Sequence, residues 1–595
     1  MKYKVGYIVF VFLLSVTASH AQMQFNFNGL GRSIVTSSKM SGPSLAGDTT
    51  TRSKGVSGYT LFDLQPNILI NNNVKVNAIL RLRNPFGSFY GAYTAFSFRQ
   101  FQVMGRIGKS VEYELGDIYI GNMTKYTVYK PYETDHQYEA DVFSLRRSVA
   151  EYENFVKGNM WRLQGVQGRT LFGFNRGIKT LGVNLFAVRT NATDNKTIPD
   201  RIMAGGRAVV KQSEYLTVGV NYVGLLDVTV NSDAVNYSNN VFTADAKVSL
   251  DRENFLLQLN GEFGGSNCKY VQVYHDSIGA KYSDYVGEGG LQAVIKPVKL
   301  KLFGSYRYVG AQFTSPAAQT ARLNIDQISQ VTTNPNPHTI QSPSLFGQLN
   351  QGTSARPISL NDRLVDEQLY NRSISPVLYN YLPQYGNITP YGEATPNRQG
   401  MTFGVASDTS AKVIKGELRT DLFSEIIGEG VTDKRKYTSV KGGLFFNFGK
   451  LLKINRNLSV NVGARQENTK RGGLAPVNFK STLIDLGGSF EVLKKFDLLA
   501  GIKLLNASGN EYLSVRNQFN QIQYFGLTSQ FSGLTNLPGY QLNLMEKIYS
   551  FGFKIRFAER SYFTTNYNVS NYKDTGYSNY NYNISQLFFN YTLIF

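Results

Sequence analysis

The stretch Leu587-Phe-Phe-Asn-Tyr-Thr-Leu-Ile-Phe595 decides the fold. Side chains of an extended strand alternate between two faces. One face of this stretch therefore carries Leu587, Phe589, Tyr591, Leu593 and Phe595. A strand that closes a β-barrel in lipid needs an outward apolar row of this kind, since a closed barrel leaves no strand edge unpaired. The stretch predicts the last strand of a membrane-embedded barrel.

These nine residues resemble the closing strand of Gram-negative outer-membrane β-barrel proteins, where a terminal Phe belongs to the insertion signal. The resemblance implies that the row ending in Phe595 is a barrel-closing signal. It also implies three kinds of partner, namely outer-membrane lipid, lipopolysaccharide and the barrel-assembly machinery. The location that it implies is the cell outer membrane.

The same alternation recurs throughout the chain. Val74, Val76, Ala78, Leu80 and Leu82 share one face of a predicted strand, and the opposite face carries Lys75, Asn77, Arg81 and Arg83. A helix would distribute these residues around its circumference, so the period of two favours a strand with one apolar and one polar face. Ile79 and, in a later strand, Phe445 are exceptions, because both are apolar on the polar face.

We parse the chain into about 22 such strands, within a range of 20 to 24. The fold class is therefore all-β, a transmembrane antiparallel β-barrel without an amino-terminal plug domain. The predicted strands are 24–35, 57–70, 74–84, 92–105, 111–121, 158–173, 176–191, 202–211, 214–228, 241–251, 254–264, 284–296, 299–312, 399–408, 412–427, 435–449, 456–470, 479–493, 496–506, 541–557, 560–573 and 583–595.

The connections sort by length onto two sides of the barrel, as outer-membrane barrels require. Short turns and both termini fall on one side, and all long connections fall on the other, which we expect to be extracellular. The long connections are 37–56, 122–157, 265–283, 313–398 and 507–540. Within 122–157, Val142, Leu145, Val149 and Tyr152 recur at helical spacing and predict a short amphipathic helix in or over the barrel mouth. Segment 313–398 either folds into the lumen as a plug or packs on the surface.

The amino-terminal segment predicts export. Lys2 and Lys4 precede an apolar run that ends at Ser19-His-Ala21, so we expect residues 1–21 to be a signal peptide and 22–595 the barrel. The formal charge is +20. Removing two lysines from 62 basic residues leaves 60 against 42 acidic ones, or +18. Without a clustered basic stretch, this charge favours anionic lipid over nucleic acid as the partner.

Enzymatic sites find little support, and we predict neither an enzyme nor a cofactor. His136, His275 and His338 lie in predicted loops outside any metal-binding motif. Gly105-Arg-Ile-Gly-Lys-Ser110 lacks the first Gly of a phosphate-binding loop and lies in a strand turn. One weak metal candidate is a Ca²⁺ site in an external loop. Its ligands would be Glu133, Asp135, Glu139 and Asp141.

Basic residues on the predicted lumen face are the best functional clue. They are Lys75, Arg81, Arg83, Lys301, Arg307, Lys441, Lys554 and Arg556. Rings of Lys and Arg in a pore attract anions. In wide barrels such residues also form paired networks with Asp and Glu, and we favour this second interpretation.

The strand count resembles that of TonB-dependent transporters. Those proteins carry a plug domain before the first strand, for which this chain leaves no room. The strand Leu115-Gly-Asp-Ile-Tyr-Ile-Gly121 and the Tyr/Asn-rich composition resemble large barrels of Bacteroidota, some of which serve secretion or gliding. We expect a channel or partner-gated conduit, for anionic or polar solutes or for surface export, with a periplasmic or surface protein as a further partner. The alternative is a structural or adhesive barrel whose long loops bind glycans or proteins.

Overall fold

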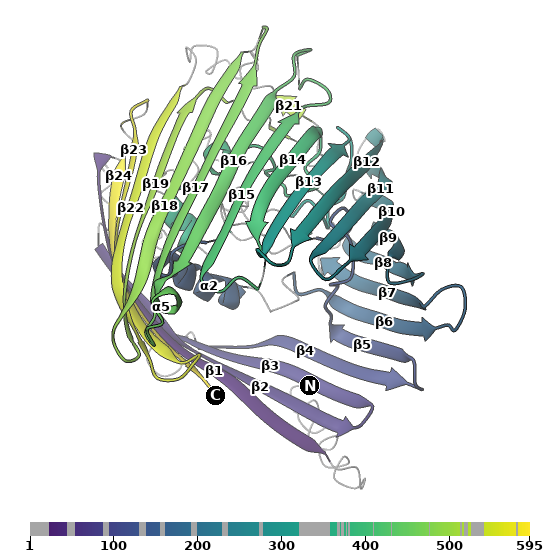
Figure 1. The fold of residues 1–595 in the computed structure, drawn as a ribbon, viewed down its shortest axis with the longest axis horizontal. Coiled ribbons are helices and arrows are strands. Elements are labelled where there is room, and N and C mark those ends of the chain that lie inside the picture. Colours follow the sequence, from purple (N-terminus) through teal and green to yellow (C-terminus); the bar gives the residue numbers. More distant parts are fainter. Residues whose placement is uncertain are drawn as a thin grey trace.

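The computed structural model is a closed barrel of 22 antiparallel strands (Figure 1). The structure describes residues 23–43, 54–86, 94–129, 138–154, 161–191, 199–228, 236–272, 278–320, 358–365, 369, 374–376, 378, 381–408, 410–429, 431–474, 476–511, 515–516, 522–524, 541–576, 578 and 581–595. The predicted signal peptide 1–21 lies outside these residues.

Each barrel strand pairs with its neighbours in the chain. The wall consists of β1 Gln24–Ser41, β2 Lys54–Asn71, β3 Val74–Pro85, β4 Ala95–Ile107, β5 Val111–Asp117, β6 Gln164–Gly173, β7 Thr180–Asn191, β8 Asp200–Lys211, β9 Leu216–Val228, β10 Asn236–Asp251, β11 Phe255–Gln272, β12 Ile278–Ile295, β13 Leu300–Val309, β14 Arg398–Ser407, β15 Ile414–Ser424, β16 Lys436–Asn447, β17 Leu458–Arg471, β18 Val477–Leu493, β19 Phe496–Gly509, β22 Leu542–Arg556, β23 Tyr562–Asp574 and β24 Tyr582–Ile594. The two short strands β20 Val515–Arg516 and β21 Ile522–Tyr524 pair only with each other.

The barrel closes between its first and last strands. β24 pairs antiparallel with β1 from Leu30↔Ile594 to Ser41↔Asn583. Closure leaves no unpaired sheet edge, which is the condition for a β-structure to cross lipid. The predicted fold class and strand number are confirmed.

The outer surface of the barrel is apolar around its circumference. Side chains on widely separated strands, Phe101, Leu185, Phe263, Leu418 and Phe551, are between 48% and 65% exposed. Exposed apolar surface on every side of a closed barrel is the surface that lipid covers. This outer face and the closed sheet place the protein in the cell outer membrane.

Helical structure is sparse. The described helices are α2 Asp141–Asn154, α4 Leu360–Val365, the 3₁₀ turn η4 Pro383–Tyr385 and α5 Phe448–Leu451. None of the described helices is long and apolar enough to span a membrane. The helix predicted within 122–157 is present as α2.

The connections at one end of the barrel include tight turns, and those at the other end include the long connection 310–397. We call the side with turns such as Asn71–Val74 and Leu493–Phe496 the short-turn end, and the opposite side the long-loop end. The prediction of a long loop at 265–283 is wrong, because β11 and β12 pair in register up to Gln272↔Ile278. Its outward side chains Asn267 and Lys269 are polar, so the stretch lacks the apolar outer row that identifies a strand of the barrel.

The strand predicted over 111–121 is also too long. β5 ends at Asp117, whose carboxylate accepts a hydrogen bond from the backbone N–H of Phe101 at 2.6 Å. Gly116 adopts φ +94°, and a Cβ there would lie 2.3 Å from the Phe101 carbonyl oxygen. The chain then turns inward, and Ile118 is completely buried.

Candidate functional site: the occluded lumen

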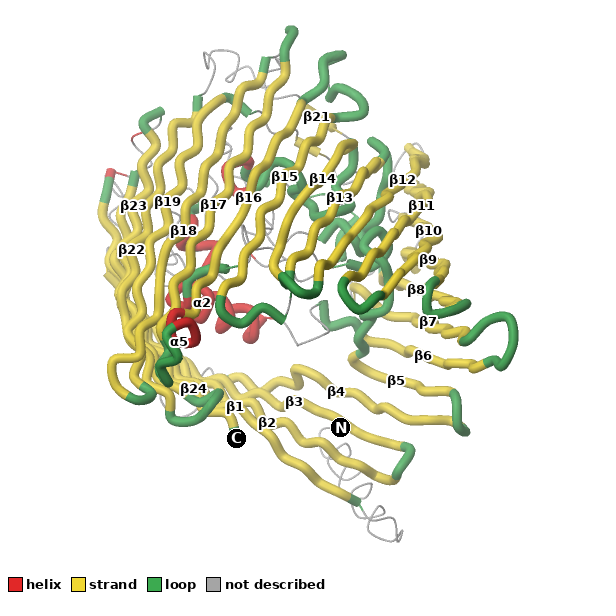
Figure 2. The backbone as a smooth tube through the Cα atoms, in the orientation of Figure 1, coloured by secondary structure: helices red, strands yellow, loops and turns green. Residues whose placement is uncertain are grey.

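The lumen is occupied by five stretches of the long connections, which we call the infolded segments. They are 118–129, 138–154, 310–320, 358–365 and 381–397. Figure 2 shows these helices and loops inside the strand wall. Each contributes buried side chains, for example Tyr126, Val142, Phe313, Leu360 and Tyr385. The open question about segment 313–398 is settled for its described residues, which fold into the barrel.

Helix α2 packs on an apolar stretch of the inner wall. Its first turn carries Val142 and Phe143, which join a buried cluster with Leu483 of β18 and Leu499 of β19. A Cβ on Gly501 would lie 2.7 Å from Val142, so this glycine allows close approach of the helix to the wall. The apolar face found at helical spacing therefore packs against the lumen wall.

The amino-terminal end of α2 is also held by charges. Lys503 of β19 donates to Glu139 at 2.6 Å and to Asp485 of β18 at 2.5 Å. Arg147 of α2 contacts Glu139 at 2.6 Å. Tyr138 stacks on Phe445 of β16 with ring centroids 6.5 Å apart. The contact accounts for Phe445 as an apolar exception on the polar face.

The carboxyl-terminal end of α2 meets a group of arginines around Asp63 of β2. Arg81 binds both carboxylate oxygens of Asp63 at 2.7 Å, and Arg99 binds one at 3.0 Å. Tyr152 of α2 donates its hydroxyl to the same carboxylate at 2.6 Å. Burial raises the pKa of the Tyr152 phenol to about 12, so it remains a donor at neutral pH. Asp63 is completely buried, and its charge is compensated by this pairing.

Two of the wall arginines contact the last turn of the helix directly. Arg32 of β1 forms an ion pair with Glu153 at 3.2 Å, and Arg81 donates to the Glu153 backbone carbonyl at 3.0 Å. Cations near the last carbonyls of a helix complement its macrodipole. The wall thus stabilises α2 at both ends by charge.

Arg146, in the middle of α2, is buried without a carboxylate partner among the described residues. Its guanidinium donates to the amide oxygen of Gln586 and lies 4.8 Å from the centre of the Phe588 ring. Within the described part of the chain, its Nε and Nη1 atoms have no hydrogen-bond partner. Burial lowers the pKa of this arginine to about 9. An uncompensated buried charge opposes docking of the helix.

A second polar network fixes the opposite side of the lumen. Glu288 of β12 accepts from Lys125 and Tyr126 of the first infolded segment and from Arg307 of β13 at 3.3 Å. Arg307 also pairs with Glu393 of the last infolded segment. Desolvation raises the pKa of Tyr126 well above its ordinary value. The wall pair Glu288–Arg307 therefore connects two infolded segments to the wall.

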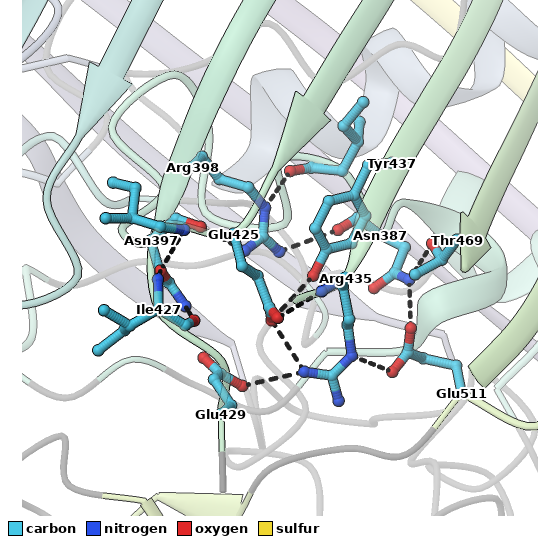
Figure 3. Close-up of polar contacts among 12 residues, drawn as sticks. Asn387, Asn397, Arg398, Glu425, Ile427, Glu429, Arg435, Tyr437, Thr469 and Glu511 are labelled. Carbon is cyan, nitrogen blue, oxygen red and sulfur yellow. Dashed lines mark hydrogen bonds and ion pairs between the residues drawn. The ribbon is translucent and has the colours of Figure 1, made fainter. Parts of the chain in front are cut away.

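A third network lies near the long-loop end (Figure 3). Arg435 contacts Glu425 at 2.9 Å, Glu429 at 3.4 Å and Glu511 at 3.0 Å. Glu511 also accepts from the Asn387 side chain at 2.9 Å. Desolvation raises the pKa of Glu511, although Arg435 opposes this shift.

Residues at the start of β14 complete this network. Arg398 donates to the backbone carbonyl of Ile388 at 2.9 Å and lies 4.1 Å from the Tyr437 ring centre (Figure 3). Asn397, at φ +59°, accepts from the backbone N–H groups of Ile426 and Ile427 at 2.9 and 3.0 Å. The last infolded segment is thus tied to the connection between β15 and β16.

A cavity of about 780 Å³ opens beneath the first infolded segment. Asn122 and Met123 of that segment line it together with Lys109, Arg169 and Arg207 of the wall. Arg207 pairs with Asp245 at 2.7 Å, so part of the positive charge is compensated. The cavity reaches Lys109 in the β4–β5 turn and therefore lies toward the short-turn end.

Among the eight predicted lumen-facing basic residues, several are paired with acids. Arg81 binds Asp63, Arg307 binds Glu288, and Arg556 binds Asp497 at 2.9 Å. Three others lie over aromatic rings: Arg83 over Tyr59 at 4.0 Å, Lys301 over Phe303 at 5.4 Å and Lys554 over Tyr562 at 4.7 Å. Lys441 is half-buried, and Lys75 is exposed near the β2–β3 turn. The structure does not gather the eight into one ring.

Two of the four residues of the predicted Ca²⁺ site belong to the part of the chain that the structure describes. Glu133 and Asp135 lie outside the described residues. Glu139 is held by Lys503 and Arg147, and Asp141 begins α2. Among the described residues, no group of three or more His, Cys, Asp or Glu side chains could hold a metal ion.

The predicted closing row lies on the outer face of β24. Tyr591, Leu593 and Phe595 are 40%, 40% and 50% exposed, and Leu587 and Phe589 are half-buried on the same face. Their role as an insertion signal stays a prediction.

Sequence reasoning missed the acidic half of the networks. Asp63, Glu288 and Asp485 are each inward-facing and at most slightly exposed. Strand parity could have placed these acids on the lumen face beside the predicted bases. Tyr385, whose hydroxyl contacts Glu546 of β22, belongs to a connection that parity does not describe.

Comparisons add a distant likeness to known barrels. No family model matches the sequence, and no curated protein matches it. Among solved structures, it is similar to OccK11 (OpdR) of Pseudomonas aeruginosa, with 8% identity, 96% of both chains covered and a TM-score of 0.34. It is also similar to OccAB1 of Acinetobacter baumannii, with 9% identity, 97% of this chain and 98% of that chain covered, and a TM-score of 0.32. The translocation pore of the P pilus usher PapC is similar with 9% identity, 95% of this chain and 99% of that chain covered, and a TM-score of 0.33. At these scores the likenesses assign neither family nor function.

Proposed function

We propose that the protein is a gated conduit of the outer membrane and that the infolded segments form its closed gate. The observation that carries the proposal is the way α2 is docked. Its two ends are held by ion pairs with the wall, at Glu139–Lys503 and Arg32–Glu153, and its middle buries Arg146, which has no carboxylate partner among the described residues. Such a helix is less firmly docked than one fixed by apolar packing throughout.

The geometry supports passage of polar solutes once α2 moves. Undocking would expose Arg32, Arg81 and Arg99 on the inner wall, together with the acids that now pair with them. The cavity beneath residues 121–123 would form the mouth on the short-turn side. A periplasmic or surface protein that binds α2 or its flanking residues could supply the energy for opening.

Planar-bilayer recording of the purified protein tests the proposal. We expect rare openings of the unchanged protein and frequent ones of the variant Glu139→Gln/Glu153→Gln, which loses the two ion pairs that hold the ends of the α2 segment to the wall. Glu112→Gln/Glu214→Gln is the matched control, because it removes two exposed carboxylates at the short-turn end. If none of the three proteins shows channel openings, and a variant lacking 313–397 shows none either, the proposal of a conduit is wrong.

The alternative is a structural or adhesive barrel with a permanently filled lumen. The apolar cluster that joins α2 and α4 to the inner wall favours it, because Leu360 and Leu364 of α4 bury apolar surface beside Phe143. In that case the glutamine variant would remain silent while the folded barrel stays intact.

A further inference from the structure

Three neighbouring turns at the short-turn end form one continuous surface. They are the connection 448–457, which includes α5, the β18–β19 turn at 494–495 and the β22–β23 turn at 557–561. Arg456 of the first donates to the Val492 carbonyl at 2.8 Å. Lys495 of the second donates to the Phe557 carbonyl of the third at 3.4 Å. We call this surface the basic-aliphatic patch.

The patch concentrates positive charge. Its exposed basic residues are Lys450, Lys453, Arg456, Lys494, Lys495 and Arg560. Glu491 of β18, beside the patch, is buried and accepts from the backbone N–H groups of Asn457 and Lys495 at 2.8 and 2.7 Å. Glu559 alone is an exposed acid within these described turns.

Large apolar side chains alternate with these bases. Leu451, Leu452, Ile454, Leu493 and Phe557 are between 48% and 64% exposed. They continue the lipid-facing wall, since Phe446 of β16 stacks on Phe448 at 5.9 Å and Phe490 of β18 is also exposed. Exposed aliphatic and basic residues together, at the edge of a lipid-facing wall, lie at the boundary between hydrocarbon and headgroups.

Two of the lysines occupy backbone conformations that favour glycine. Lys453 has φ +55° and Lys495 has φ +69°. A β-carbon in this region strains the backbone. Lysine at both positions places an ammonium group at the headgroup boundary that glycine could not supply.

We propose that the basic-aliphatic patch binds the phosphate of an anionic phospholipid in the leaflet at the short-turn end. The aliphatic side chains enter the acyl region while the lysines reach the headgroup phosphate. Continuity with the lipid-facing wall favours a lipid over an acidic protein as the occupant. The inference goes beyond the conduit proposal and does not depend on it.

Native mass spectrometry of the full-length protein tests this site with phosphatidylglycerol, phosphatidylcholine and inorganic phosphate as probes. We expect selective retention of phosphatidylglycerol and a loss of about fivefold in its binding for each lysine removed in Lys450→Gln/Lys453→Gln/Lys494→Gln. The matched control is Lys75→Gln/Lys109→Gln/Lys299→Gln, three exposed lysines in or beside other short turns. Lys299 matches Lys453 in its backbone, with φ +54°.

Four outcomes would overturn the proposal. They are equal retention of phosphatidylcholine, an equal loss in the control triple, competition by inorganic phosphate alone, and an acidic protein that stays bound to the patch after delipidation. A second variant, Leu451→Asn/Leu452→Asn, keeps every lysine and should also weaken phosphatidylglycerol binding. Unchanged binding in that variant would reduce the site to non-specific ion pairing and contradict the proposal.

Discussion

Gly29 and Phe595 exchange two backbone hydrogen bonds, of 2.9 and 3.1 Å, where the barrel closes. A Cβ on Gly29 would lie 2.2 Å from the Phe595 ring, and that ring stacks on Phe62 of β2 at 5.7 Å. The absence of a side chain at residue 29 thus allows the ring to lie across β1.

This relationship predicts a coupled effect on barrel stability. Phe595→Ala should lower the free energy of unfolding by about 1 kcal/mol, because it removes the aromatic pair with Phe62. Gly29→Ala should cost a similar amount by displacing the ring, and it should cost almost nothing in the Phe595→Ala background. Urea unfolding in lipid vesicles measures the cycle, and additive losses would show that the two residues are independent.

Arg146→Met should make the gate tighter. The substitution replaces a buried, uncompensated charge by an apolar side chain of similar length, which is neutral or stabilising by about 1 to 4 kcal/mol. We expect fewer openings in bilayer recordings. The neighbouring variant Arg147→Met should act in the opposite direction, because it removes the contact with Glu139. More openings in Arg146→Met than in the unchanged protein would refute this assignment.

Asp63→Asn should change both gating and selectivity. It leaves Arg81 and Arg99 without their shared carboxylate, which weakens docking of Tyr152 by about 3 kcal/mol. We expect more frequent openings and a shift toward anion selectivity, measured as the reversal potential in a salt gradient. Adding Arg81→Glu and Arg83→Glu should reverse that shift. Anion selectivity that survives both changes would remove these residues from any role in selectivity.

Strongly alkaline solution should loosen the gate. The pKa of Tyr152 is raised to about 12, and desolvation also raises the pKa values of Tyr126 and Tyr385. Between pH 10 and pH 12 an undocked phenol loses its proton while docked Tyr152 keeps it, so rising pH favours undocking. Openings should increase across this window and less so in Tyr152→Phe. An identical pH profile in both proteins would exclude Tyr152 from the effect.

Strand alternation was sufficient to predict the wall. The pattern of Val74 to Arg83 and its repeats identifies all 22 barrel strands, because lipid on one side and polar groups on the other impose a period of two. The pattern fails where that contrast ends. Residues 266–272 extend β11 beyond its apolar outer row, and the sequence there predicts a loop.

The filling of the lumen was predictable only in part. The spacing of Val142, Val149 and Tyr152 predicts α2. The alternation of side chains along a strand shows on which face of the wall a residue lies, but it does not show which connection covers that residue. One signal was present, since the inner face of β19 carries Leu499 and Leu505, both buried, beside Asp497 and Lys503. An apolar inner face indicates a covered lumen wall, because water would otherwise contact it. Contacts such as Tyr385–Glu546 depend on how a long connection folds back.

A reversible crosslink tests most directly whether α2 is a movable gate. A Cβ on Gly443 would lie 3.7 Å from the Tyr138 Cβ, which suits a disulfide. The crosslinked variant is Tyr138→Cys/Gly443→Cys. It also carries Cys268→Ser, which removes the native thiol, and Glu139→Gln/Glu153→Gln, which favours opening. Bilayer conductance should be absent in the oxidised protein and appear when reductant is added. Equal conductance in both states, with the crosslink verified by mass spectrometry, would contradict the gate.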